Sequence, residues 1–197
     1  MRRFALIAFA LAAAAVPAAA QYVSDAEPFI TAVRERDGNK VTEMIDKRPT
    51  IVNSRNLKGE TALVIAISRT DELWTTYLLG KGANPNLATS TGDTPLMAAA
   101  RVGYTQAIEY LLALGAKVDA TNKMGETALI LAVQNRELDA VKMLLAKGAD
   151  PDKKDAAAGY SARDYAKRDT RSKTILTAIE TAGKPAPKKD DLDSFKL

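Results

Sequence analysis

The same short run of residues returns three times at a constant interval, and this period constrains the fold more than any other feature of the chain. Each run reads Gly, an acidic residue, Thr, Ala or Pro, and Leu. The glycines that begin the runs lie 33 residues apart: Gly59, Gly92 and Gly125. A Gly-Ala pair returns with the same spacing, at Gly82, Gly115 and Gly148. A unit of this size cannot bury its own apolar face and must stack on its neighbours, so the period predicts a solenoid.

The unit from Gly92 to Asp119 indicates what each copy can form. The Thr94 hydroxyl can cap a helix by accepting from a backbone N–H, and Pro95 follows at the first helical position, where no N–H is missed. Small and apolar residues then recur at helical spacing in two successive runs, separated by Gly103. Gly115 stands where the end of a helix favours a left-handed residue. Each unit therefore predicts two short helices and a connecting loop.

The 33-residue period, together with the Thr-Pro-Leu core at residues 94–96, resembles the ankyrin repeat family. The resemblance implies an all-α solenoid in which each unit is a helix-turn-helix with a β-hairpin loop. It also implies three full repeats between degenerate N-terminal and C-terminal capping repeats. We expect this domain over residues 21–183: a cap at 24–55, repeats at 56–88, 89–121 and 122–154, and a second cap at 155–183.

The sequence departs from the family pattern at two sets of positions. The usual His after the Thr-Pro-Leu core is replaced by apolar residues, Val64, Met97 and Ile130. Thr70 and Arg136 stand where Gly103 keeps the glycine that is usual in the family. These changes concern the local geometry at helix ends, and we expect the fold to be retained.

The N-terminal capping repeat is less regular than the repeats that follow. We expect its first helix to begin near Ala26 and to bury Phe29, Ile30 and Val33. The Asp-Gly-Asn sequence at 37–39 is expected to form the turn to a second helix. Pro49 is expected to end that second helix, since proline cannot continue it.

The first 20 residues have the pattern of a signal peptide. A basic start at residues 1–3 precedes an uncharged apolar run from Phe4 to Val16, and Ala18 to Ala20 offers a small-residue cleavage site before Gln21. A retained membrane anchor is the alternative, although the run is short for a membrane span. We expect cleavage near Ala20–Gln21 and a bacterial protein exported to the periplasm, or secreted.

Composition removes most catalytic chemistry. The chain has no cysteine and no histidine, so it lacks thiol nucleophiles, Ser–His–Asp triads and zinc sites built on these residues. Two groups of aspartates could in principle act without histidine, Asp150 with Asp152 and Asp190 with Asp191 and Asp193. They lack the loop signature of an EF-hand, and we interpret them as solvated charges. We expect no enzyme activity, no cofactor and no metal site, with a small enzyme or metal-dependent factor as a remote alternative.

The charge of the chain is close to balanced. Its 28 Lys and Arg residues stand against 24 Asp and Glu, and loss of Arg2 and Arg3 with the signal peptide would halve the formal charge of +4. This balance gives no support to nucleic acid binding. Residues 184–197 begin with Lys and Pro and have little to bury, so we expect a disordered tail. We expect a monomer with no membrane association after cleavage.

The family resemblance also implies where a partner binds: at the hairpin tips and on the exposed side of the first helices of the repeats. Carried over to this sequence, the candidate positions are Arg55, Leu57, Lys58, Glu60, Arg69, Ser90, Thr91, Asp93, Arg101, Lys123, Met124, Glu126, Gln134 and Asn135. Leu57 and Met124 are the most informative, because apolar side chains at exposed tips suit the core of an interface. A single exposed apolar residue is also common on protein surfaces and can be without function. Trp74 is interpreted as a core residue.

These expectations lead to a non-enzymatic adaptor that acts after export. Its partner is an unidentified protein that contacts the tips and the concave helix face. The alternative is a secreted effector that binds a host protein.

Overall fold

The structure is a computed structural model that describes residues 18–182, with side chains described from residue 25 onward. The expected signal peptide falls mostly outside the described residues, at 1–17, and the expected tail at 184–197 falls wholly outside them. Over the described part the chain forms ten α-helices, one short 3-10 helix and no β-strand. The predicted all-α solenoid is confirmed.

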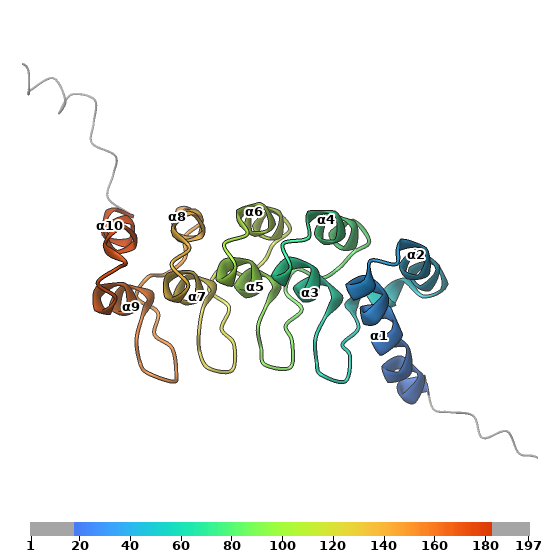
Figure 1. The fold of residues 1–197 in the computed structure, drawn as a ribbon. Coiled ribbons are helices and arrows are strands. Elements are labelled where there is room, and N and C mark those ends of the chain that lie inside the picture. Colours follow the sequence, from blue (N-terminus) through green and yellow to red (C-terminus); the bar gives the residue numbers. More distant parts are fainter. Residues whose placement is uncertain (1–17, 183–197) are drawn as a thin grey trace, which may run out of the picture.

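The helices form five successive pairs. Their bounds are α1 Ala18–Glu35, α2 Gly38–Lys47, α3 Ala62–Ser68, α4 Glu72–Gly80, α5 Pro95–Arg101, α6 Thr105–Ala113, α7 Ala128–Gln134, α8 Leu138–Ala146, α9 Ala162–Arg168 and α10 Lys173–Thr181, with the 3-10 helix at Pro49–Asn53. The pairs stand side by side in one row (Figure 1). The second helices of the pairs lie along one side, the first helices lie in the middle, and long loops project on the opposite side (Figure 1).

The first helices of the repeats begin at a hydroxyl that returns with the period. Thr61, Thr94 and Thr127 accept, through their side chains, from backbone N–H groups three residues further on, at 3.3, 3.2 and 3.2 Å. Ser161 caps α9 in the same way, at 3.2 Å from Asp164 N. Such caps satisfy N–H groups that have no partner within the helix. The predicted cap at Thr94 is confirmed.

The first helices of the first four pairs end in one backbone conformation regardless of sequence. Gly103 has φ 66°, and Thr70 and Arg136 adopt φ values of 52° and 62° at the same place in their units. Arg36, after α1, has φ 62°. The left-handed region is unfavourable for residues with a Cβ, so the surrounding packing imposes this turn. The departures from glycine therefore change the strain at the turn and leave its path unaltered.

The loops differ from the hairpins expected in one respect: the described residues contain no extended strand pairs. Isolated bridges join Arg55 to Thr61 and Lys154 to Ser161. In the loop between Arg55 and Thr61, two backbone hydrogen bonds close the turn: Asn56 N donates to Glu60 O at 3.1 Å, and Gly59 N donates to Asn56 O at 2.8 Å. The loops are thus tight hairpin turns on arms that do not form a regular ladder.

The N-terminal cap corrects two details of the expectation. Helix α1 begins at Ala18 and not near Ala26, and it contains Pro28. The turn lies one residue earlier than expected, because Asp37 caps α2 by accepting from Lys40 N at 3.0 Å. Gly38 is then already helical. The predicted burial of Phe29, Ile30 and Val33 is confirmed.

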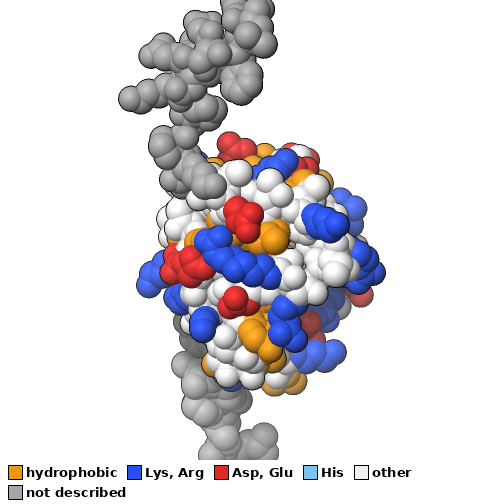
Figure 2. All heavy atoms as spheres, turned by 90° about the vertical axis from the view of Figure 1, so that its left-hand side faces the viewer, with side chains coloured by type: hydrophobic (Ala, Val, Ile, Leu, Met, Phe, Trp, Pro, Cys, Tyr) orange, Lys and Arg blue, Asp and Glu red, His pale blue; other side chains and the backbone are white. Residues whose placement is uncertain are grey.

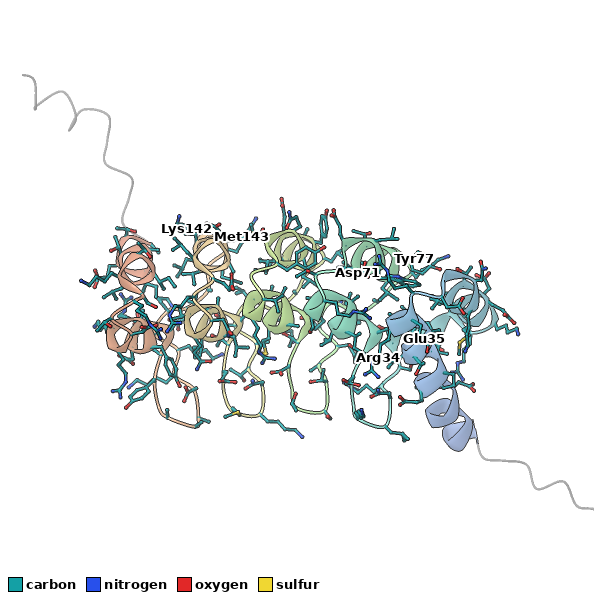
Figure 3. All side chains as sticks on the ribbon, viewed as in Figure 1. Arg34, Glu35, Asp71, Tyr77, Lys142 and Met143 are labelled. Carbon is teal, nitrogen blue, oxygen red and sulfur yellow. The ribbon has the colours of Figure 1, made fainter. Side chains whose placement is uncertain are left out.

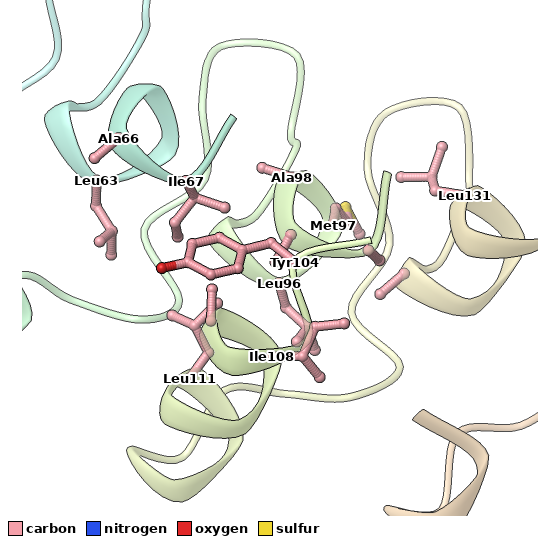
Figure 4. Close-up of a cluster of buried hydrophobic side chains, with 14 of the residues drawn as sticks. Leu63, Ala66, Ile67, Leu96, Met97, Ala98, Tyr104, Ile108, Leu111 and Leu131 are labelled. Atoms are coloured by element: carbon pink, nitrogen blue, oxygen red, sulfur yellow. The ribbon is translucent and has the colours of Figure 1, made fainter. Parts of the chain in front are cut away.

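The core is continuous through the row of units. Around Tyr104, apolar side chains from three helices meet, including Ile67 of α3, Leu96 of α5 and Leu111 of α6 (Figure 4). The first helices are rich in alanine, and residues 96–100 of α5 are buried throughout. Small side chains allow these helices to pack closely against both neighbours, which a single unit could not provide. Trp74 is 6% exposed and belongs to this core, as predicted.

The C-terminal end of the solenoid is polar. Viewed from that end, Lys, Arg, Asp and Glu side chains are spread over the surface with small apolar areas between them (Figure 2). A repeat stack needs such an end, because an apolar outer face would continue to recruit copies.

The strain at Thr70 can be tested by replacing it with glycine. We expect Thr70→Gly to raise the free energy of unfolding by roughly 0.5–1 kcal/mol. A left-handed backbone costs an L-residue about 1–2 kcal/mol, and the larger chain entropy that glycine loses on folding offsets part of the gain from removing this strain. The Thr70 hydroxyl donates only within its own turn, to Arg69 O at 2.7 Å, so little else is lost. Urea unfolding measures the change. Equal or lower stability of the variant would show that the turn is not strained.

Candidate protein-binding surface

The structure places the sequence-predicted site residues in two rows along the solenoid. One row consists of loop residues at the hairpin tips, Arg55, Leu57, Lys58, Glu60, Ser90, Thr91, Asp93, Lys123, Met124 and Glu126. The other consists of residues at or just after the C-terminal ends of α3, α5 and α7, Arg69, Arg101, Gln134 and Asn135. Because the units stand side by side, each row runs across several repeats (Figure 1).

Asparagine side chains shape two of the tips, a role that the sequence reasoning missed. Asn56 Oδ1 accepts from Lys58 N at 3.1 Å and from Glu60 N at 2.9 Å. Asn122 Oδ1 accepts from Met124 N at 2.9 Å and from Glu126 N at 3.0 Å. The 66-residue separation of the two, twice the repeat period, was the available signal. These bonds fix the backbone that presents the tip residues.

The last hairpin uses an aspartate in the same role. Asp155 Oδ1 accepts from Ala158 N at 2.7 Å and from Gly159 N at 3.0 Å, and Tyr165 donates its hydroxyl to Asp155 Oδ2 at 2.6 Å. Burial opposes the charge of this carboxylate, but the Tyr165 and backbone hydrogen bonds lower the pKa of Asp155 overall. The last tip is therefore ordered by a charged acceptor.

Neighbouring tips are joined by backbone hydrogen bonds. Ser90 N donates to Gly59 O at 2.8 Å, Lys123 N to Thr91 O at 3.1 Å, and Ala156 N to Met124 O at 2.8 Å. The tips approach so closely that a Cβ on the turn glycine would collide with the next tip: it would lie 2.9 Å from Lys123 N at Gly92 and 2.4 Å from Ala156 N at Gly125. The row of tips is thus one connected surface.

Several predicted site residues hold the repeats together. Arg55 Nε donates to Ala88 O at 2.7 Å, and Ser90 Oγ donates to Lys58 O at 3.0 Å. Arg69 donates to Arg34 O at 2.7 Å. Each of these bonds crosses from one unit to the next. These side chains already have partners within the chain, so binding a ligand through them would mean sharing or breaking those bonds.

The acidic members of the set also have hydrogen-bond and ion-pair partners within the chain. Asn122 donates to Asp93 at 2.9 Å and to Glu126 at 2.8 Å, and Arg101 pairs with Asp93 at 3.1 Å. Glu60 accepts from Asn56 and forms an ion pair with Arg34. The Asn56 amide holds the pKa of Glu60 below its ordinary value, against the opposing effect of burial, and Arg34 adds to the lowering.

Both large apolar members of the set are exposed. Leu57 is 77% exposed and Met124 is 54% exposed. The neighbouring Lys58 and Lys123 are also exposed, as is Thr91 on the tip between them. Apolar side chains held in water on a fixed backbone, with lysines beside them, can bind a protein surface that combines an apolar patch with acidic groups.

Sequence reasoning did not identify two further exposed apolar residues, Leu73 in α4 and Leu114 after α6. They are 68% and 54% exposed and belong to the second-helix side, away from the tips. Leu73 stands next to the buried Trp74, whereas both chain neighbours of Leu114 are exposed.

A second ladder along the repeats is structural. Asn53 Oδ1 accepts from Asn84 N at 2.7 Å, Asn86 Oδ1 accepts from Lys117 N at 2.9 Å, and Asp119 Oδ1 accepts from Asp150 N at 3.0 Å. Each bond ties one unit to the next near the start of the loop. The 33-residue spacing of the acceptors was a signal that could have revealed it.

Within residues 18–182, no group of three metal-ligating side chains is positioned to hold an ion. Asp152, one of the aspartates considered above, forms a two-bond pair with Arg163 at 2.7 and 3.1 Å. The Arg163 hydrogen bond lowers the pKa of Asp152. None of the described helices is both long and apolar enough to cross a membrane.

Comparison with protein families identifies the repeat. The family model for ankyrin repeats (3 copies) matches residues 29–122 and 74–155. Together these segments span well over half of the chain. A search of curated proteins found no match.

The close approach of the tips can be tested with two glycines that share a backbone conformation. Gly125 and Gly159 have φ values of 77° and 72°, but an added Cβ meets nothing within 4 Å at Gly159. Both alanine variants bear the left-handed strain, and only Gly125→Ala also displaces the next tip. We expect it to lower the free energy of unfolding by at least about 1 kcal/mol more than Gly159→Ala. Urea unfolding of both variants checks this, and equal losses would contradict the tip contact.

The junction between α7 and the last unit should respond to acid. The Arg136 side chain, at 2.7 Å, and the Arg171 backbone N–H, at 3.0 Å, hold the pKa of Asp169 far below its ordinary value. A depressed pKa stabilises the fold above about pH 4, the ordinary range for Asp, and this contribution is lost as the pH falls further. We expect Asp169→Asn and Arg136→Gln to lose less stability than the parent chain between pH 5 and pH 2, measured by urea unfolding. An unchanged loss would exclude the pair from this role.

Proposed function

Because the chain belongs to the ankyrin repeat family, whose repeats are generally protein–protein interaction modules, we propose that it is a non-enzymatic adaptor that binds a protein through its hairpin tips. The exposed ends of the first helices in the repeats complete the proposed surface. Ankyrin repeat proteins typically lack enzymatic activity, and the absence of His and Cys supports the same conclusion for this chain.

One observation supports the tips: apolar side chains are exposed there on turns whose backbone is already fixed. Leu57 and Met124 stand on turns ordered by Asn56 and Asn122. Ordering a loop upon binding costs free energy, and a surface ordered in advance avoids that cost. Exposed apolar residues with no partner are unfavourable in water, and an interface would remove them from it.

The lysines beside these residues define the partner further. Lys58 and Lys123 are exposed at the first and third tips, while the acidic residues behind them, Glu60 and Glu126, are engaged within their own turns. The outermost charge of the two tips is therefore positive. The partner surface that suits it has an apolar centre and acidic residues at its margin.

The proposed site of action is outside the cytoplasm, on the basis of the signal-peptide pattern in residues 1–20. We expect a processed chain that begins near Gln21 in the periplasmic fraction of a bacterial source. N-terminal sequencing of the fractionated protein tests this. An unprocessed chain in the cytoplasm would contradict export, and recovery from the medium would favour the secreted effector.

The binding surface is tested with two matched double variants. Leu57→Ser with Met124→Ser removes the exposed apolar groups of the tips, and Leu73→Ser with Leu114→Ser removes two comparably exposed leucines from the second-helix side. We expect the tip variant to weaken partner binding at least about tenfold, a loss of about 1.4 kcal/mol that the two residues share if they lie at the centre of the interface. The control variant should bind like the parent chain.

The measurement is crosslinking of immobilised protein in envelope extract, followed by titration of the identified partner. Thermal unfolding of each variant confirms that the fold is retained. Retention of binding by the tip variant together with loss in the control would place recognition on the second helices and refute the proposal.

A further inference from the structure

An apolar groove runs between the second helices of the last two units. It lies between α8 and α10, has a volume of about 650 Å³ and is open to solvent. Leu138 and Leu145 line it from α8, and Ala178 and Ala182 line it from the α10 side. It is on the second-helix side of the solenoid, opposite the loops (Figure 1).

At this groove the last unit lacks a large side chain that the earlier units share. Tyr77, Tyr110 and Met143 recur with the 33-residue period on the second helices. Figure 3 shows Tyr77 beside α4 on the side of α2, and Met143 beside α8 on the side of α6. Tyr77 reaches back to the preceding helix, where its hydroxyl is 3.0 Å from Thr42 Oγ1. In α10 the buried pair Ile175 and Ile179 sets the register, and Ala178 then occupies the corresponding place.

The charged side chains that line the groove are both lysines. Lys142 and Lys173 line it and are both exposed, and Lys142 projects from the outer side of α8 (Figure 3). An occupant therefore needs apolar side chains for the floor of the groove and carboxylates for the lysines at its sides.

The chain that follows α10 has this composition. Residues 184–189 contain two prolines and three lysines, and residues 190–197 read Asp-Asp-Leu-Asp-Ser-Phe-Lys-Leu. Leu192 and Phe195 are three residues apart, so they face the same way in a helix. Asp190, Asp191 and Asp193 supply carboxylates beside them.

The connection is short enough to favour binding and long enough to allow it. Ala182 lines the groove, and the 15 residues from Gly183 to Leu197 follow it directly. A nine-residue helix such as α10 is about 13 Å long, whereas 15 extended residues span about 50 Å. A tether of this kind gives the segment an effective concentration of about a millimolar, so weak contacts suffice.

We propose that residues 190–197 bind in the α8–α10 groove of the same chain, with Leu192 and Phe195 in the space beside Ala178 and the aspartates against Lys142 and Lys173. The segment takes the place of the large side chain that α10 lacks and gives this last helix a second packing surface. The expected disorder of the tail then applies to residues 184–189. The groove is on the opposite side from the tips, so its occupation leaves the proposed partner surface exposed, and either proposal can fail without the other.

The absence of cysteine allows a direct test in the full chain. A nitroxide attached to Ser194→Cys should selectively weaken the amide NMR signals of α8 and α10 beside the groove. Leu192→Ser with Phe195→Ser, in the same labelled chain, should abolish that effect, because the segment loses its apolar contacts. Signals that are unaffected at α8 and α10, or weakened evenly over the whole surface, would overturn the proposal.

Two further measurements separate the alternatives. Lys142→Glu should reduce the effect, whereas Lys147→Glu should preserve it, because Lys147 is also exposed and follows α8 directly but does not line the groove. A mixture of isotope-labelled chains without nitroxide and unlabelled chains with nitroxide reports binding between copies. An effect seen only in that mixture would assign the groove to the tail of a second copy and overturn binding within one chain.

Discussion

The structure depends on how closely neighbouring hairpin tips approach one another. A backbone N–H of each following tip donates to a carbonyl of the tip before it, and the turn glycine leaves no room for a side chain at the contact between Gly125 and Ala156. Positive φ alone would also allow asparagine, so the crowding is the stronger reason for glycine. This contact sets the spacing of the loops, while alanine-rich first helices set the spacing of the core.

The regular part of the fold follows from the sequence because the same residues perform the same task in each unit. The hydroxyl caps at Thr61, Thr94 and Thr127 mark the helix starts, and these starts agree with the pattern to within one residue. The prediction for the N-terminal capping repeat was less accurate, because this unit does not follow the 33-residue period. There, a local cap at Asp37 decided where the turn fell. The backbone conformation of Thr70 and Arg136 could not be predicted from the sequence, since packing between units imposes the left-handed conformation there.

The candidate surface was only partly predictable. The exposure of Leu57 and Met124 agrees with the position of these residues at turn tips. Which polar residues are engaged was not readable from spacing, because it depends on the neighbouring unit: Asp93 accepts from Asn122 of the next repeat, and Arg69 donates to Arg34 O of the preceding one. The tip residues that differ between repeats thus include both side chains that bond to neighbouring units and side chains that are exposed. The sequence alone did not separate these two classes.

The central claim is that recognition occurs at the tips, and site-specific photo-crosslinking in cells that make the protein tests it most directly. Benzoylphenylalanine would replace Lys123 at the third tip in one strain and Lys147, beyond α8, in another, both being exposed lysines of the same repeat. The account predicts a discrete protein adduct from position 123 and none from position 147. An adduct from position 147 with none from position 123 would contradict it.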